Sequence, residues 1–431
     1  MINSRQLVLT SLLRLENGGY SNLVLGETLN DPNLSASDRA FVSTLFYGVI
    51  ERKLTLDFYI SRLSKTKIQK LDKDILCILR MGLYQIIYLD SVPDSAAVNE
   101  SVRLAKKNKN PRLSGFVNGV LRSFLRERDR ISALPKDKFL RKSVKYSCPE
   151  WLVKKLCSEY GEDNAEDFLA DSLKTSKLFI KTNTVKTDSE SLIKKLSDEG
   201  FAVETFKHDP EVLTVSGTGL FSSNAYREGL FHVQDYSSTF AAKSLGAKPG
   251  ERVLDICAAP GGKTFTIAEN MQNKGKIVAC DIHPSRVQLI SEGAKRLSLD
   301  IVSTAVNDAA VYNETLGVFD RVLCDAPCSG FGIIGRKPEI KYKSPGEIKD
   351  LPQIQLKILT TAARYLKKGG TLIYSTCTLN RDENDGVAEK FLAENSDFKG
   401  ADDFDGKYTK TVFPKTFGSD GFFISKFIKI K

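Results

Sequence analysis

Apolar residues recur at helical spacing over the first 130 residues of the chain. The pattern predicts helices over residues 7–15, 37–49, 54–63 and 71–88, another that begins at Asp94, and a last one around 117–121. The helix over 71–88 is the most apolar of these and is expected at the centre of a bundle. Prolines at 93 and 111 mark turns, and no alternating strand pattern occurs. Residues 1–130 are therefore predicted to form a small all-α domain.

A mixed pattern follows over residues 131–240. A helical stretch that Pro135, Pro149 and Trp151 open runs through Leu169 and precedes a predicted strand at 178–183, a helix at 189–199 and a second strand at 212–215. This alternation predicts a small α+β connector subdomain. Such a subdomain could be a simple connector between its neighbours, or it could dock RNA. The sequence leaves both interpretations open.

Apolar β-branched runs alternate with helical patterns over residues 241–431. This alternation predicts a Rossmann-like, doubly wound α/β domain with a parallel sheet. Ligands of such domains bind beyond the carboxyl ends of the strands. The predicted strands are 252–256, 276–280, 300–305, 320–324, 371–375 and 422–427, and the predicted helices are 264–270, 285–297, 348–366 and 387–392.

The composition supports a folded, multidomain protein. The chain has 431 residues, of which 41% are hydrophobic and 27% charged, so it is long enough for two or three domains and too apolar for wholesale disorder. No apolar run approaches the length of a membrane span. Charged and polar side chains interrupt the N-terminal region, which therefore lacks the layout of a secretory signal. We expect a cytoplasmic protein that does not contact a membrane.

Positive charge is concentrated in the helical front. The whole chain has a formal net charge of +10, and residues 1–130 hold 20 Lys and Arg against 13 Asp and Glu. A basic surface suggests a polyanionic partner, with phosphate contacts that give affinity without sequence readout. The alternative is an ordinary solvated charged face. The candidate contacts are Arg103, Lys106, Lys107, Lys109, Arg112, Arg122, Arg126, Arg128 and Arg130.

Three candidate ligand-binding segments occur at the ends of the first three strands predicted in residues 241–431. A small-residue loop follows the first strand, Asp281 ends the second, and Asn307-Asp308 follow the third. The loop lacks the spacing of a Walker A or GxGxxG loop, which makes phosphate cradling the weaker interpretation. An acid for ribose hydroxyls and a polar pair for an adenine edge are typical of S-adenosylmethionine sites, although Asp281 alone would equally suit a helix N-terminus. The predicted cofactor-binding residues are Cys257, Ala258, Ala259, Pro260, Gly261, Gly262, Lys263, Asp281, Asn307, Asp308 and Asp325.

Two of the eight cysteines follow predicted strands at the ligand end of the sheet. Cys328 stands in the segment Asp325–Gly332, and Cys377 stands in Ser375-Thr376-Cys377-Thr378. Buried structural thiols are the commoner fate of cysteine, but a glycine-rich loop is a poor site for a packing side chain. No CxxC pair or zinc-finger spacing occurs, so no metal site is expected.

Two thiols and an acid suit methyl transfer to carbon 5 of cytosine. That carbon is a weak nucleophile until a thiolate adds to carbon 6 of the ring. The covalent adduct must afterwards lose the carbon 5 proton and expel the enzyme. An acid near N3 of the ring stabilises the charge that develops during addition, and methylation of an amine needs none of these groups.

These segments resemble the RNA cytosine-5 methyltransferase family. The resemblance rests on the loop Cys257–Lys263, the segment Asp325–Gly332 and the triplet Thr376-Cys377-Thr378. The helical front is similar to the NusB-like RNA-binding domain at Phe46-Tyr47-Gly48-Val49, at residues 79–84 and at residues 116–122. A NusB-like front joined to such a back is similar to bacterial enzymes that methylate 16S small-subunit rRNA.

The resemblance implies roles for four residues. Cys377 of the Thr-Cys motif would be the nucleophile, and Cys328 of the Pro-Cys motif would help to resolve the adduct. DNA cytosine-5 enzymes instead attack with the Pro-Cys thiol. Asp325 would hold the base, and Lys263 would lie near the cofactor and favour a thiolate, the alternative being a solvent-exposed lysine at a helix start.

One position departs from the family pattern. Members often carry Arg-x-Asn in the connector strand, where this chain has Lys181-Thr182-Asn183. Lysine keeps the charge but loses bidentate phosphate geometry, which weakens the case for RNA contact by this strand.

Two classes of function follow from the sequence. The first is an S-adenosylmethionine-dependent cytosine-5 methyltransferase acting on 16S rRNA or a small-subunit precursor, with tRNA as the rival substrate. The second is a non-catalytic RNA-binding or antitermination factor, which the helical front alone would suggest. The two thiols, Asp325 and Lys263 favour the enzyme, which we expect to be monomeric.

Overall fold

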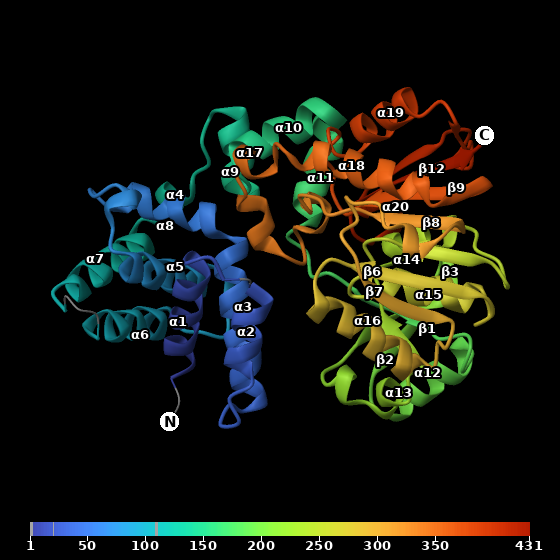
Figure 1. Cartoon of the computed structure of the whole chain (residues 1–431). Coiled ribbons are helices and arrows are strands. Elements are labelled where there is room, and N and C mark those ends of the chain that lie inside the picture. Colours follow the sequence, from blue (N-terminus) through green and yellow to red (C-terminus); the bar gives the residue numbers. More distant parts are fainter. Residues whose placement is uncertain (1–2, 20, 108–110) are drawn as a thin grey trace. The chain divides into compact units, whose positions relative to one another are not determined.

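The chain forms two compact units. The computed structural model describes residues 3–19, 21–107 and 111–431. One unit contains Met1–Leu173 and Lys337–Tyr342, and the other contains Lys174–Arg336 and Lys343–Lys431 (Figure 1). The two units are defined by contacts within the fold. They do not test the predicted domain ranges 1–130, 131–240 and 241–431, which stay predictions.

The first unit contains no strand in its described residues, and the prediction of an all-α front is confirmed. The short helices α2 and α8 were not predicted from the sequence. No helix in the described ranges is both long and apolar enough to cross a membrane. The elements are α1 (Ser4–Glu16), α2 (Ser21–Leu29), α3 (Ala36–Glu51), α4 (Lys53–Leu63), η1 (Ile68–Lys70), α5 (Lys73–Tyr88), α6 (Asp94–Lys106), α7 (Leu113–Arg126), α8 (Arg128–Ser132), α9 (Lys138–Tyr146), α10 (Glu150–Tyr160), α11 (Glu162–Asp171) and η5 (Pro338–Tyr342).

Helix α5 lies in the core of this unit, as its apolar sequence predicts. Its N-terminus is capped by Asp72, whose side chain accepts hydrogen bonds from two backbone N–H groups of the first turn. Arg80 is also buried in this helix, and its guanidinium donates to both carboxylate oxygens of Asp57 at 2.7 and 2.8 Å. Glu16 accepts a third hydrogen bond from the same group at 3.1 Å. Arg80 of the NusB-like motif therefore stabilises the bundle and is not available to a phosphate.

The short helix η5 belongs to the helical unit although its chain neighbours belong to the other unit. The hydroxyl of Tyr342 donates to the Ile50 carbonyl at 2.7 Å, and Lys341 Nζ donates to the Glu51 carbonyl at 2.7 Å. Lys341 is only 1% exposed, and burial lowers its pKa to about 8. These bonds satisfy the carbonyl groups at the end of α3 that the helix itself leaves open.

The second unit begins with a four-stranded antiparallel sheet. Its strand order is β2-β3-β1-β4, and the apolar faces of β1, β3 and α12 form a small core. The predicted strands at 178–183 and 212–215 and the helix at 189–199 are all present, whereas β2 and β4 were not predicted. The elements are β1 (Leu178–Thr182), α12 (Ser189–Asp198), β2 (Ala202–Phe206), β3 (Asp209–Ser216), η2 (Leu220–Ser222), α13 (Asn224–Arg227) and β4 (Phe231–Val233).

An eight-stranded mixed sheet forms the rest of the second unit. Strands β9, β8, β5, β6 and β7 are parallel in that order. The expected parallel sheet needs one correction, because β12 pairs antiparallel with β9, β10 and β11. β12 returns antiparallel beside β9 after the intervening strands β10 and β11. The strands are β5 (Arg252–Asp255), β6 (Lys276–Asp281), β7 (Val302–Val306), β8 (Phe319–Asp325), β9 (Leu366–Thr376), β10 (Phe398–Gly400), β11 (Thr409–Val412) and β12 (Phe422–Lys429).

Helices cover both faces of this sheet, which confirms the doubly wound arrangement (Figure 1). Neighbouring residues along one strand point to different cores: Val253 packs with α14, α15 and α16, while Leu254 packs with α18 and α19. This alternation follows the two-residue period of a strand. The remaining elements are α14 (Tyr236–Ser244), α15 (Gly262–Asn270), α16 (Pro284–Leu297), η3 (Glu314–Leu316), η4 (Phe331–Ile333), α17 (Pro345–Ile348), α18 (Leu351–Arg364), α19 (Asp385–Glu394) and α20 (Pro414–Phe417).

Gly48 of the NusB-like motif allows α3 to approach α5. A Cβ atom at Gly48 would lie 1.9 Å from Cζ of Tyr84. We expect Gly48→Ala to lower the free energy of unfolding by roughly 1–3 kcal/mol, because the ring must shift within a packed core. Urea unfolding measures the loss, and hydrogen exchange of α5 assigns it to this unit.

Gly26→Ala in α2 is the matched control. A Cβ atom there meets no atom within 4 Å, so the substitution should stabilise the helix by up to about 1 kcal/mol. Equal losses from the two substitutions would contradict the steric explanation.

Candidate active site

Two thiols meet at the carboxyl end of the parallel sheet. Cys328 follows β8 and Cys377 follows β9, and their Sγ atoms are 3.4 Å apart. The strands are in register there, with Asp325 opposite Ser375. Beyond the strands, Gly332 N–H donates to the Cys377 carbonyl at 3.0 Å. Strand pairing thus brings together two cysteines that are 49 positions apart in the sequence.

A cation and a carboxylate lie beside the thiols. Lys263 Nζ donates to Asp325 Oδ2 at 2.7 Å, and Ser375 Oγ donates to Asp325 Oδ1 at 2.7 Å. The ammonium group also lies 5.1 Å from the ring centroid of Phe422. Burial alone would lower the pKa of Lys263, but the charge and hydrogen bond of Asp325, together with the charges of Cys377 and Asp255, raise the net pKa above the ordinary value. Lys263 is therefore a retained cation with a side chain only 12% exposed, unlike a solvated lysine at a helix start.

The two thiols differ in pKa. The hydrogen bond from the Cys328 thiol lowers the pKa of Cys377, against burial and the Asp325 charge, and Lys263 acts in the same direction as the hydrogen bond. The same hydrogen bond and burial raise the pKa of Cys328 well above its ordinary value. Of the two cysteines, Cys377 therefore has the lower pKa and ionises more readily. A thiolate is the nucleophilic form of cysteine.

The loop Cys257–Lys263 follows β5 and leads into α15. Ala258 N–H donates to the Cys280 carbonyl at 2.7 Å, which holds the loop against the end of β6. Asp255, just before the loop, is fully buried; its Oδ2 accepts from Thr264, while its Oδ1 has no hydrogen-bond partner among the described residues. Burial raises the pKa of Asp255 to about 7. The sequence analysis did not single out this carboxyl group.

The other two predicted cofactor-binding positions, Asp281 and Asn307-Asp308, lie next to each other at the ends of β6 and β7. Asn307 N–H donates to the Asp281 carbonyl at 3.0 Å. The Asp281 carboxylate is buried, 3.0 Å from Arg286 Nη1, and it accepts from the His283 N–H. Asp308 is exposed, and its carboxylate accepts from the Ala310 N–H at 2.9 Å, which engages it in the local turn.

The residues at these strand ends fit S-adenosylmethionine. The open Oδ1 of Asp255 can accept from an ammonium group, and Asp281 can accept from ribose hydroxyls. Ile282 follows Asp281 with its side chain 52% exposed, which suits contact with the face of an adenine ring. Ile282 could not be identified from the sequence, because an apolar residue after a strand carries no distinguishing signal.

Lys181 does not contact solvent. Its side chain is 0% exposed, and Nζ donates to Glu269 Oε2 at 3.0 Å and lies 3.2 Å from Glu211. Asn183 is also buried and donates to the carbonyls of Gly229 and Leu297. The departure from Arg-x-Asn therefore lies in a buried network of the second unit, and a phosphate contact by Lys181 is excluded in this conformation.

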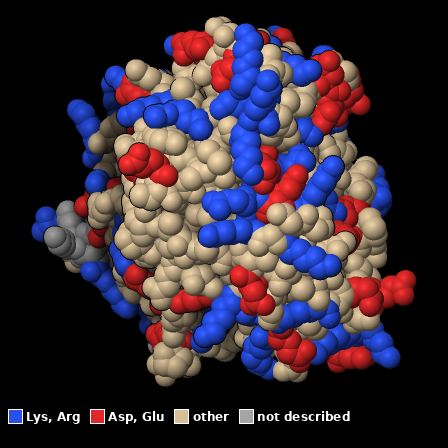
Figure 2. All heavy atoms as spheres, turned by 45° about the vertical axis from the view of Figure 1, so that its right-hand side comes forward, with Lys and Arg blue, Asp and Glu red and all other residues tan. Residues whose placement is uncertain are grey.

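Several of the basic side chains predicted to contact RNA are exposed in the helical unit. Arg103, Arg126 and Arg130 have side chains that are 65%, 70% and 71% exposed, each within reach of a neighbouring glutamate. Lys109 of the predicted basic group lies outside the described residues. Figure 2 shows Lys and Arg side chains intermixed with Asp and Glu over one face of the molecule. That mixture agrees with the modest net charge of residues 131–431.

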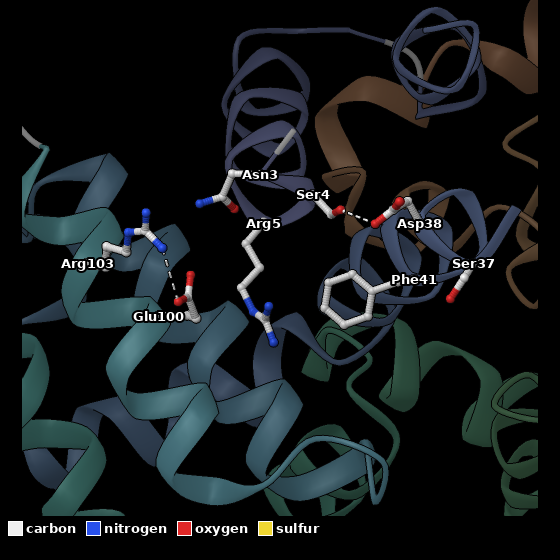
Figure 3. Close-up of a pocket in the computed structure, with 8 residues that line it drawn as sticks. All are labelled: Asn3, Ser4, Arg5, Ser37, Asp38, Phe41, Glu100 and Arg103. Carbon is white, nitrogen blue, oxygen red and sulfur yellow. Dashed lines mark hydrogen bonds and ion pairs between the residues drawn. The ribbon is translucent and has the colours of Figure 1, made fainter. Parts of the chain in front are cut away.

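The helical unit also contains a cavity of about 670 Å³ between the starts of α1 and α3 and the end of α6. Figure 3 shows its lining residues from these helices. Arg5 lies over the ring of Phe41 at 4.9 Å and donates to Gln85 at 2.7 Å. On the polar wall of the cavity, Ser4 donates to Asp38 at 2.8 Å and Arg103 forms an ion pair with Glu100 at 3.5 Å. Among residues 3–19, 21–107 and 111–431, no group of three or more His, Cys, Asp or Glu side chains could hold a metal ion.

Comparison with known proteins agrees with this geometry. Residues 242–428 match the family described as 16S rRNA methyltransferase RsmB/F. Residues 2–126 match the NusB family, and residues 148–219 match the ferredoxin-like domain of RsmF/B-like methyltransferases. A crystal structure of the protein PH0851 has a TM-score of 0.83 and 28% identity, covering 100% of this chain and 99% of the other.

Two bacterial relatives match along the whole chain. A probable ribosomal RNA small subunit methyltransferase B of Bacillus subtilis (strain 168) is 39% identical over 435 residues, covering 97% of each chain. A protein of the same description from Synechocystis sp. is 34% identical over 446 residues, covering 100% of each chain. The predicted S-adenosylmethionine-dependent methyltransferase with a NusB-like front is confirmed. The chain belongs to the RsmB/F family of 16S rRNA methyltransferases.

Proposed function

We propose that this protein methylates carbon 5 of a cytosine in 16S rRNA through a covalent bond between Cys377 and carbon 6 of the base. The observation that carries the proposal is the 3.4 Å contact between the two thiols beside the Lys263–Asp325 pair. Methyl transfer to oxygen or to an amine requires no thiol, so two cysteines in a methyltransferase site favour carbon 5 chemistry.

Attack on the base begins at Cys377. Its sulfur forms the bond to carbon 6, and the electrons of the carbon 5–carbon 6 double bond move into the ring. Asp325 is the group we assign to N3 of the base: N3 takes up a proton from solvent as the electrons arrive, and the ionised carboxylate accepts a hydrogen bond from the resulting N3–H. Lys263 and Ser375, both hydrogen-bonded to Asp325, hold that carboxyl group in one orientation.

Release is the step that we assign to Cys328. S-adenosylmethionine, when bound at Asp255, Asp281 and the loop Cys257–Lys263, supplies the methyl group that carbon 5 takes up. Carbon 5 must then lose its proton to a base, and the carbon 6–sulfur bond must break with its electrons returning to Cys377. The Cys328 thiol is within hydrogen-bond reach of the Cys377 sulfur; it can give its proton to the departing sulfur and, as the resulting thiolate, take up the carbon 5 proton.

The proposed rRNA substrate is supported by the descriptions of the relatives and by the exposed arginines of the helical unit. The bacterial relatives are described as small-subunit rRNA methyltransferases, and the exposed arginines of α6 and α7 suit phosphate contacts. Membership of a methyltransferase family favours the enzyme over a non-catalytic antitermination factor. Our proposal includes a cytoplasmic, monomeric enzyme that acts on 16S rRNA or a small-subunit precursor, with tRNA as the substrate to exclude.

Methyl transfer by cysteine variants tests the proposal. With 16S rRNA and labelled cofactor, Cys377→Ala should lose all detectable 5-methylcytosine because no other thiolate attacks carbon 6. Cys328→Ala should bind RNA covalently and fail to release it, which a denaturing gel detects. Cys157→Ala, at another partly exposed cysteine, should retain activity. A covalent RNA complex in Cys377→Ala would reverse the assignment of the two thiols, and equal transfer to tRNA would contradict the substrate.

Alkylation of Cys377 tests the role of Lys263. Replacement of the cation in Lys263→Met should raise the pKa of the Cys377 thiol, because Lys263 favours the thiolate and the unpaired Asp325 opposes it. Iodoacetamide labelling of Cys377 at neutral pH should therefore slow, with its midpoint at higher pH. Lys367→Met, which removes an exposed lysine paired with Asp320, is the control. An unchanged midpoint in Lys263→Met would refute thiolate stabilisation by this lysine.

A further inference from the structure

A buried carboxylate lies behind the two cysteines. Glu383 is in the turn between β9 and α19, and its side chain is 0% exposed. It accepts four hydrogen bonds: from Ser329 N at 2.8 Å, Ser329 Oγ at 2.5 Å, Gln355 Nε2 at 2.9 Å and Asn380 Nδ2 at 2.8 Å. Four donors match the lone pairs of an ionised carboxylate, which is an acceptor only.

The four hydrogen bonds join the segments that carry the thiols. Ser329 is the residue after Cys328, and Asn380 is three positions beyond Cys377. Ser329 Oγ lies 2.7 Å from Thr378 Oγ1, which makes a second bond between the two cysteine loops. Gln355 of α18 also donates to the Pro327 carbonyl at 2.9 Å, on the other side of Cys328. The distance between the two sulfurs therefore depends on Glu383 as well as on strand pairing.

The charge of Glu383 acts on the thiols unequally. All four of its donors are uncharged groups, so the hydrogen bonds leave its negative charge in place. Burial and hydrogen bonding are the main causes of the raised pKa of Cys328, and the Glu383 charge adds to them. Lys263 acts in the opposite sense on Cys377. A carboxylate behind one thiol and an ammonium group beside the other thus push the pKa values of two neighbouring cysteines in opposite directions.

We infer that Glu383 is a positioning residue that holds the two cysteine loops together and keeps Cys328 in its thiol form beside the Cys377 thiolate. The inference rests on the proposed cytosine chemistry, in which the two thiols act in different steps. Glu383 does not touch the reacting atoms and works through Ser329, Asn380 and its charge.

Site-specific labelling tests the electrostatic part without RNA. In a Cys377→Ala background the coupling between the thiols is absent, so alkylation of Cys328 against pH reports the remaining charges. Adding Glu383→Gln should move the labelling midpoint of Cys328 to lower pH, because a neighbouring negative charge has been removed. Glu383→Asp keeps the charge and should leave the midpoint closer to that of the parent variant. An identical midpoint in all three proteins would overturn the electrostatic role.

Single-turnover methylation of 16S rRNA tests the positioning part. Glu383→Gln should still attack the base but should release RNA roughly tenfold or more slowly, since general acid–base steps contribute at least that much. The covalent RNA complex should accumulate. Glu269→Gln neutralises an equally buried carboxylate whose partners are Lys181 and His232, and it should not cause accumulation.

The outcomes separate this inference from the proposed function. A wild-type protein that forms neither 5-methylcytosine nor a covalent complex would refute the proposed function. Wild-type activity with unaltered release in Glu383→Gln would refute only the positioning role. If Glu383→Gln does not fold, Ser329→Ala removes one donor and keeps the charge; it should slow release in the same direction, and normal release would overturn the inference.

Discussion

The pairing of β8 with β9 is the contact on which the candidate site depends. These parallel strands end in register at Asp325 and Ser375, so the loops that follow them leave the sheet side by side. Each loop contributes one cysteine, and Ser375 donates to Asp325 across the pair. A shift of the register by one residue would turn each side chain to the opposite face and separate the thiols.

Opposite charges lie near the two thiols and shift the pKa values of Cys377 and Cys328 in opposite directions. Lys263 lies on the Cys377 side and is held there by Asp325, while Glu383 is buried behind Cys328. One sulfur can therefore be a thiolate while its neighbour at 3.4 Å remains a thiol. Both charges lie in protein interior of low dielectric, where they act more strongly than in water. The hydrogen bond between the sulfurs reinforces the difference, because it needs one donor and one acceptor.

Local sequence predicts those features that depend on neighbours in the chain. Helical spacing identified α3, α5 and α7, alternating runs identified the parallel strands, and the two cysteine motifs identified the residues that meet. Short elements such as α2 and β4 were missed because few residues carry their pattern. The direction of β12 depends on its partner β9, which an apolar run does not specify.

Long-range contacts decided the rest of the site. Glu383 stands in the polar run Asn380–Asp385, which is typical of a solvated turn, yet Ser329 and Gln355 bury it. Lys181 carries the charge expected of a phosphate contact and is instead paired with Glu269. Tyr342 belongs to the helical unit through bonds to the end of α3. In each case the partner is distant in sequence, so composition and spacing could not predict burial.

The most direct test of the account is to identify which sulfur binds the base. An RNA substrate with 5-fluorocytosine at the target position traps the adduct, because fluorine on carbon 5 cannot leave as a proton does. Digestion and mass spectrometry then identify the cysteine that carries the nucleotide. The account predicts the nucleotide on Cys377, and a nucleotide on Cys328 would contradict it.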